Sequence, residues 1–193
     1  MLLRLVVALS STGCVAAFAA PPLRASAGAT GRVVDGEAPS SSVTTDLRIA
    51  IVPTQLIAPE HRSFDVGAGY LSQQMPDEGN AHEAGFVDLS MPFVRRRIGG
   101  VPVGFRSSVG VQGRIEHETT TGYGGALQVT SELMSFVSRH DACTRARGEW
   151  AAGLFAEVAA ARMGEATIRS TTLGLTVRLP AVAHFSIEHQ RCD

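Results

Sequence analysis

Apolar and polar side chains alternate along most of this chain of 193 residues, and this period of two constrains the fold more than any other feature. Successive side chains of a β-strand point to opposite faces, so each alternating run is typical of a strand with one apolar face. The clearest run is 101–117, where Val101, Val103, Phe105, Val109, Val111 and Ile115 oppose Arg106, Ser108, Gln112, Arg114 and Glu116. The pattern returns at 64–70, 87–93, 127–137, 150–158 and 173–179, and predicts an all-β chain.

The two faces of these strands differ in charge. The apolar faces at 101–115, 125–137, 150–160 and 171–179 carry no charged residue, whereas the opposite faces carry Arg106, Arg114, Glu132, Glu157 and Arg178. Consecutive strands joined by short turns keep two open edges unless the sheet closes or stacks. With 47–56 as the first strand and 185–189 as the last, we predict an antiparallel up-and-down β-barrel of about eight strands, occupying 47–193.

In this pattern alone, residues 64–179 resemble the small eight-stranded barrels of bacterial outer membranes. The resemblance implies that the apolar faces contact membrane lipid, that the polar faces line the interior, and that the protein lies in the cell outer membrane of a Gram-negative bacterium. Two features argue against it: aromatic residues make up only 6% of the chain, and Pro92 lacks the N–H that a closed barrel needs.

Two other folds are compatible with the same sequence. A soluble β-sandwich or lipocalin-like barrel would show the same alternation with its apolar faces turned inward. Residues 131–145 and 149–163 can also be drawn as helices, although Gly153 would cost a helix about 1 kcal/mol.

The first 19 residues have the layout of an export signal, because Arg4 precedes a short apolar run at 5–9. Ser11-Thr12-Gly13-Cys14 resembles the lipobox of bacterial lipoproteins, which implies cleavage before Cys14 and lipidation of that residue. Cleavage after Ala19 by the ordinary signal peptidase is the alternative. Residues 20–46 are rich in Ala, Gly, Ser, Thr and Pro, and we expect them to form a flexible linker.

Removal of the signal leaves two cysteines, Cys143 and Cys192, which we predict to form a disulfide in an oxidising compartment. In the barrel counted above, however, the loop that holds Cys143 lies at the end opposite to the chain termini. The bond therefore requires that the chain after Pro180 runs past the rim, or that the strand count is off by one. Otherwise the two thiols stay apart.

Few sequence features point to chemistry. The net charge of −1 provides no field for nucleic acid, every basic residue is arginine, which excludes a catalytic lysine, and the six histidines show no metal spacing. We therefore expect no metal, no cofactor and no nucleic-acid partner, with membrane lipid as the expected partner. The expected role is a non-enzymatic, structural or interacting envelope protein, and the alternative is a soluble lipid-anchored periplasmic binding protein.

One set of residues suggests a remote enzymatic alternative. On a strand, His184, Ser186 and Glu188 would share one face, and the His-x-Ser pair resembles a fragment of the outer-membrane lipid A deacylases, which are acyl hydrolases. Residues two apart on a strand are about 7 Å from each other, so direct hydrogen bonding between them is awkward.

Overall fold

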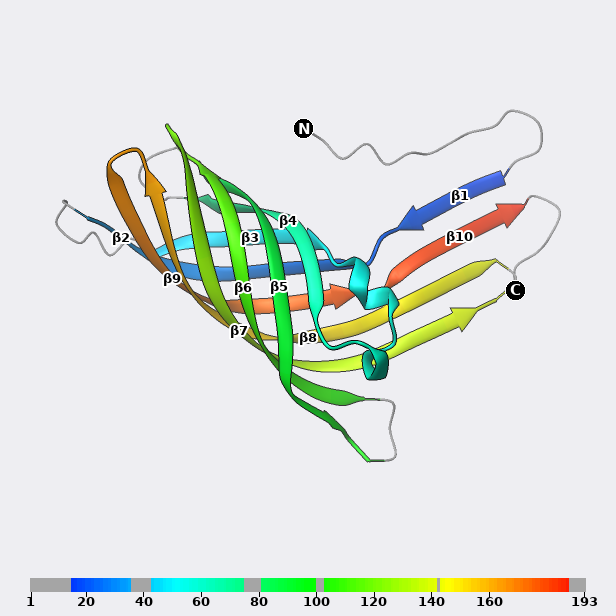
Figure 1. Ribbon diagram of the computed structural model, residues 1–193. Helices are drawn as coiled ribbons and strands as arrows, with labels where there is room; N and C mark the ends of the chain where they lie inside the picture. Colours follow the sequence, from blue (N-terminus) through cyan, green and yellow to red (C-terminus); the bar gives the residue numbers. More distant parts are fainter. Residues whose placement is uncertain (1–14, 36–42, 75–80, 100–102, 142, 188–193) are drawn as a thin grey trace.

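The computed structural model describes residues 15–35, 43–74, 81–99, 103–141 and 143–187, and these form an antiparallel all-β structure (Figure 1). Its strands are β1 (Val15–Ala20), β2 (Leu23–Val34), β3 (Val43–Ile51), β4 (Asp65–Gln74), β5 (Ala81–Arg97), β6 (Gly104–His117), β7 (Thr121–His140), β8 (Thr144–Met163), β9 (Ala166–Leu179) and β10 (Ala181–Ile187). Two short 3-10 turns, η1 (Pro53–Leu56) and η2 (Pro59–His61), separate β3 from β4. Among the described residues, no helix is long and apolar enough to cross a membrane.

Eight of these strands, β2 to β9, close into an up-and-down barrel. Each pairs with its sequence neighbours, and β9 pairs back with β2. The predicted antiparallel barrel of eight strands is therefore confirmed. A path that follows paired residues once around the barrel starts at Gln74 of β4 and ends at Met91 of β5, next to the residue that pairs with Asp65 of β4. The path therefore returns to β4 about ten residues from its start, and this shift is the stagger of the barrel. This stagger is the geometric cause of the strand tilt visible in Figure 1.

The set of strands that forms the barrel differs from the predicted set. Residues 20–46 are not a flexible linker throughout, because β2 and the start of β3 lie within them. The domain boundary at 47 is therefore wrong, and the barrel begins at Leu23. The predicted first strand, 47–56, is the end of β3 followed by η1, and β10 pairs with β1 and β8 rather than closing the ring.

The composition of β2 explains the error. Four successive outward positions in its middle are Ala25, Ala27, Ala29 and Gly31, and these small residues produce only a weak apolar period. The inward positions Arg24 and Arg32 are buried, as a strand of the barrel requires.

We call the end of the barrel where β2 begins and β9 ends the terminal end, and the opposite end the distal end. At the terminal end β9 leads through Pro180 into β10, which continues along β8 by pairing residues 181–184 with 144–147. The turn between β7 and β8 lies at this same end. The count of eight strands is right, but because β2 belongs to the barrel and β10 does not, the turn before Cys143 follows the sixth strand and not the fifth. This turn and the chain after Pro180, which runs past the rim, therefore lie at the same end.

Outward and inward faces alternate as the pattern predicted. Val111 and Leu175 are 54% and 62% exposed, whereas their neighbours Gln112 and Thr176 are 6% and 2% exposed. The apolar faces thus point outward, against the soluble alternative, which needed them to line the interior. The helical alternative is also wrong, because 131–140 and 149–163 lie in β7 and β8.

Pro92 is accommodated by an irregularity in β5. It pairs with Ser108, and the next pair is Val94 with Ser107, so one extra residue, Phe93, is inserted into the strand. Such a bulge leaves the ladder locally unpaired and reverses the facing of the residues that follow. A proline therefore occurs in this barrel without breaking it.

Candidate functional site

The outer wall of the barrel is an uncharged apolar band. Within the described strands, the outward positions at 47–51, 66–72, 85–93, 109–115, 123–135, 150–160 and 171–179 include no Asp, Glu or Arg. The most exposed large side chains include Leu47, Val87, Leu127, Leu154 and Leu173. Outward charges occur beyond this band, for example at Glu83, Arg162 and Arg169 toward the distal end and at Arg96 toward the terminal end.

Aromatic side chains concentrate on one margin of this band. Phe64, Phe93, Phe105 and Trp150 are all exposed near the terminal end, Phe64 directly before β4 and the others in the parts of β5, β6 and β8 nearest that end. Tyr123 is 68% exposed near the distal end. Trp and Tyr rings at the margins of an apolar band are typical of surfaces that meet a lipid–water interface, and Trp150 and Tyr123 occupy such positions.

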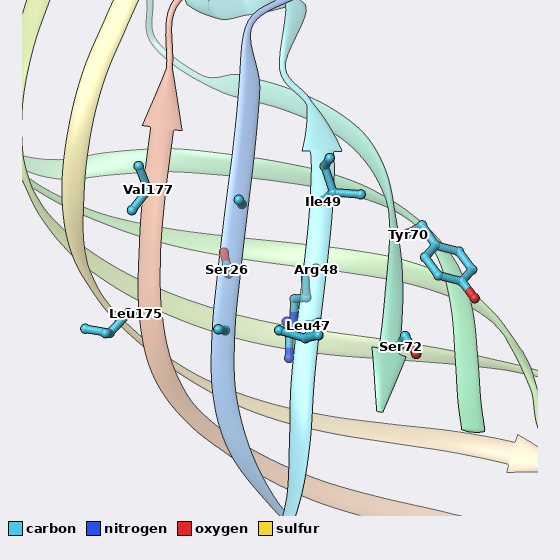
Figure 2. Close-up of a pocket in the computed structure, with 10 residues that line it drawn as sticks. Ser26, Leu47, Arg48, Ile49, Tyr70, Ser72, Leu175 and Val177 are labelled. Atoms are coloured by element: carbon cyan, nitrogen blue, oxygen red, sulfur yellow. The ribbon is translucent and has the colours of Figure 1, made fainter. Parts of the chain in front are cut away.

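The outer wall is hollowed over β2. Figure 2 shows Leu47 and Ile49 of β3 on one side of this strand and Leu175 and Val177 of β9 on the other. The alanines of β2 between them are short, which leaves an open apolar groove of about 430 Å³.

The interior is charged, and its largest cluster lies toward the terminal end. Three arginines and three carboxylates alternate there in a closed cycle, which we call the charge ring. Its bonds run from Arg62 Nε to Asp65 Oδ1 (2.7 Å), Asp65 Oδ2 to Arg178 Nη1 (3.0 Å), Arg178 Nε to Glu132 Oε1 (2.9 Å), Glu132 Oε2 to Arg106 Nη2 (2.7 Å), Arg106 Nη1 to Glu149 Oε2 (3.0 Å) and Glu149 Oε1 to Arg62 Nη2 (2.7 Å).

The charge ring crosses the lumen and joins distant parts of the chain. Its members come from β4, β6, β7, β8, β9 and the segment after η2. All six side chains are at most 5% exposed, and the three positive charges equal the three negative ones. Buried charges are tolerated only when they are paired and hydrogen-bonded. The cycle pairs every member, and Arg62 donates its hydrogen bonds outside the cycle, to the carbonyl oxygens of Thr54 and Ile57.

A second cluster lies in the middle of the barrel around Glu157. This carboxylate accepts hydrogen bonds from Arg48, with Nη2 at 3.0 Å, and from Arg114, with Nη2 at 2.5 Å. Arg48 also contacts Asp46 at 2.6 Å, and its guanidinium lies 4.9 Å from the ring centroid of Phe155. Arg24 and Asp88 form a separate buried pair at 2.8 Å.

A third cluster forms the distal rim. Arg32 of β2 donates to Glu118, with the Nη2–Oε2 distance 2.6 Å, and His82 Nε2 lies 3.2 Å from Glu116 Oε2. Burial raises the pKa of Glu118, but the hydrogen bond and charge of Arg32 outweigh it, so the pKa of this carboxyl is lowered from its usual value. Glu118 is thus held in its charged form at neutral pH.

Side chains fill the lumen at all three levels, because an eight-stranded barrel has an interior just wide enough for them. Within the described ranges, no group of three or more His, Cys, Asp or Glu side chains is arranged to hold a metal ion. The arrangement therefore supports an interior filled by paired charges inside an apolar wall.

The residues singled out in the sequence mostly lie away from these clusters. Cys14, Glu188 and Cys192 are outside the described residues. Cys143 is 8% exposed, directly before β8. His184 Nδ1 lies 3.0 Å from Thr144 Oγ1, in the part of β10 beyond the barrel. Lipidation, the disulfide and the hydrolase alternative stay predictions.

Sequence reasoning placed Arg106, Arg114, Glu132, Glu157 and Arg178 on the interior face correctly, and missed others. Arg24, Arg32 and Asp46 fell in the predicted linker, and Arg62 fell outside the predicted strands, whereas Asp65 was expected on the polar face of the strand 64–70. The alternation of Arg24, Ser26, Gly28, Thr30 and Arg32 with small residues was the signal that would have identified β2.

Comparison with known proteins gives one structural likeness. No family model matches the chain, and no curated protein matches it. The fold is similar to the crystal structure of Neisserial surface protein A (NspA), with a TM-score of 0.46 and 15% sequence identity over 82% of this chain and 95% of that chain.

Proposed function

We propose that this chain is an integral β-barrel of the cell outer membrane with a non-enzymatic, structural or interacting role. The observation that carries the proposal is the inversion of the barrel: the wall exposes large apolar side chains on its strands, while the lumen buries paired charges. This is the arrangement that a lipid solvent favours.

The size of the apolar surface supports a bilayer rather than water as the solvent. Soluble monomers rarely expose a contiguous apolar patch larger than a few hundred Å². Here the exposed apolar positions recur on successive strands around the wall, and the groove over β2 adds apolar surface that acyl chains can fill.

The lumen supports an anchoring or scaffolding role rather than passive transport. The charge ring and the cluster around Glu157 both cross the interior, so an ion in transit would have to separate buried pairs. Separating such pairs is expensive, since each leaves an uncompensated buried charge. Interactions of the protein would then be made by its ends.

Cell fractionation followed by an alkaline carbonate wash tests the proposal. Because a lipid anchor would also resist the wash, the test uses a Cys14→Ala variant exported with a conventional signal. We expect retention in the membrane pellet and heat-modifiable migration on gels. Release as soluble protein would contradict the integral barrel and favour the periplasmic binding protein.

Conductance tests the closed lumen separately. Reconstituted in planar bilayers, the protein should show no steady current. A stable open channel at low voltage would contradict the anchoring role without contradicting the barrel.

A further inference from the structure

A cavity of about 590 Å³ opens at the terminal end of the barrel, between η2 and the adjoining ends of β5, β6 and β7. Its lining includes Pro59, Arg95, Arg97, Met134 and Phe136. The volume is within the range of about 300–1,000 Å³ that small-molecule sites occupy. The lining combines positive charge with apolar surface.

The bulge at Phe93 turns two arginines toward this cavity. Without the extra residue, Arg95 and Arg97 would continue the outward face of β5. With it, Arg95 pairs with Arg106, whose side chain is buried in the lumen, and Arg97 pairs with Gly104. Directly opposed residues share a face, so both arginines lie on the inner side of the strand.

Other contacts hold the cavity in shape. The Arg95 guanidinium donates to the carbonyl oxygen of Pro59, which ties β5 to η2. Met134 pairs across the sheet with Gly104, and its side chain is 7% exposed. A Cβ at Gly104 would lie 3.0 Å from the carbonyl oxygen of Arg96 and 3.8 Å from Met134 Cγ, so glycine at this position allows β5 and β6 to approach closely at the cavity wall.

Positive charge in this cavity is unbalanced. The neighbouring charge ring uses its three carboxylates on its own three arginines. Within the described residues, no Asp or Glu oxygen lies within 4.0 Å of the guanidinium of Arg95 or Arg97. Glu60 also lines the cavity, and like the arginines it is exposed to solvent, but the described lining sets it against Arg95, Arg96 and Arg97, so positive charge exceeds negative charge there.

We propose that this cavity binds an amphipathic anion, a molecule with a phosphate or carboxylate group at the end of an apolar chain. The guanidinium groups of Arg95 and Arg97 pair with the anionic group, since arginine matches phosphate and carboxylate oxygens with two parallel hydrogen bonds. Met134 and Phe136 contact the chain. A membrane lipid and a free fatty acid both supply this chemistry.

Calorimetric titration of the full-length protein in phosphatidylcholine nanodiscs tests the site, with empty nanodiscs as the blank. Octyl phosphate and octanoate should bind with one-to-one stoichiometry. Octyl glucoside, which lacks the charge, and inorganic phosphate, which lacks the chain, should bind at least tenfold more weakly. Equal binding of octyl glucoside and octyl phosphate would overturn the proposal without any variant.

Variants separate the two parts of the site. The Arg95→Gln/Arg97→Gln variant should lose at least tenfold in affinity for octyl phosphate, and Phe136→Ala should weaken octyl phosphate while leaving inorganic phosphate unchanged. The Arg162→Gln/Arg169→Gln variant, which removes the same charge at the distal end, should bind like the wild type. Unchanged affinity in the Arg95/Arg97 variant, with its heat-modifiable migration intact, contradicts the site.

Native mass spectrometry of protein extracted from envelopes distinguishes the two sources. Retained phospholipid mass identifies a membrane lipid as the occupant, and retained fatty acid mass identifies the free acid. In either case the Arg95→Gln/Arg97→Gln variant should lose the adduct. An adduct of equal abundance in that variant would show that the molecule binds at another site, and this result would overturn the proposal.

Discussion

Arg106 and Glu132 face each other across β6 and β7 and form a buried ion pair, with 2.7 Å between Nη2 and Oε2 and both side chains 1% exposed. The same register places the neighbouring pair, Phe105 and Leu133, on the outer wall. A slip of one residue would exchange the two faces, bringing charges to the wall and apolar groups to the lumen. The ion pair and the wall therefore specify one register together.

We expect Glu132→Gln to destabilise the barrel by about 3–5 kcal/mol, because Arg106 and Arg178 would lose their shared carboxylate while remaining buried. The measurement is urea unfolding of the protein in detergent micelles or bilayers. The Arg106→Met/Glu132→Met variant keeps the ring neutral, so its loss of unfolding free energy should be smaller than the sum of the losses measured for Arg106→Met and Glu132→Met alone. Strict additivity would show that the ring does not act as a unit.

Arginine on the wall should be costly in a bilayer. We expect Val111→Arg and Leu175→Arg each to cost about 2–4 kcal/mol near the midplane. Both positions are more than half exposed, so a barrel in water would tolerate the same changes. Thr176→Ser, on the inner face, keeps the hydroxyl that accepts from Ser26 and should change little. Equal tolerance at wall and lumen positions, measured by unfolding in lipid, would contradict the membrane assignment.

The distal rim should respond to acid through Glu118. Its pKa is lowered in the folded state, so the pairing with Arg32 contributes stability above the usual carboxyl pKa of 4.5 and loses it as the pH falls through the folded value. At pH 7 the Glu118→Gln variant should be less stable than the wild type. The difference should shrink below about pH 4.5 in unfolding curves recorded across the acid range. A difference that is constant with pH would show that the carboxylate charge is not the cause.

Cys143 and Cys192 should be joined in the mature protein. In the antiparallel pairing of β10 with β8, His184 lies opposite Thr144, the residue after Cys143, and Cys192 is only eight residues further along the sequence. A disulfide that closes a loop of this length contributes about 4 kcal/mol in the chain-entropy model. Mass spectrometry without reduction should show the bond, and two freely alkylated cysteines would exclude it.

Much of the fold followed from the sequence, because the period of two makes the strands recognisable and Val111 and Gln112 were assigned to the correct faces. β2 was missed because Ala25, Ala27 and Gly31 contribute little hydrophobicity, and its place in the ring depends on partners more than a hundred residues away. Local pattern reasoning detects apolar faces and does not detect such long-range pairing.

The charge ring was harder to predict for a related reason. Glu132 and Arg178 were each expected on the polar face, but the 2.9 Å contact between them depends on the closure of the barrel. Arg62 enters the ring from a connection outside the strands, where no periodicity marks it. The sequence therefore predicted which strand faces carry charged side chains, but it did not predict which of these side chains form ion pairs.

The distribution of the ring along the chain also constrains how this protein can be made. Arg62, Asp65 and Arg106 belong to the first part of the chain, and Glu132, Glu149 and Arg178 belong to the last part. Neither half can neutralise its own interior, since the first half supplies an excess of guanidinium and the second an excess of carboxylate to this cycle. A partly inserted sheet would present those groups to hydrocarbon. Insertion and closure must then occur together, so a chain truncated before β9 should stall at the membrane surface and become a substrate for proteolysis.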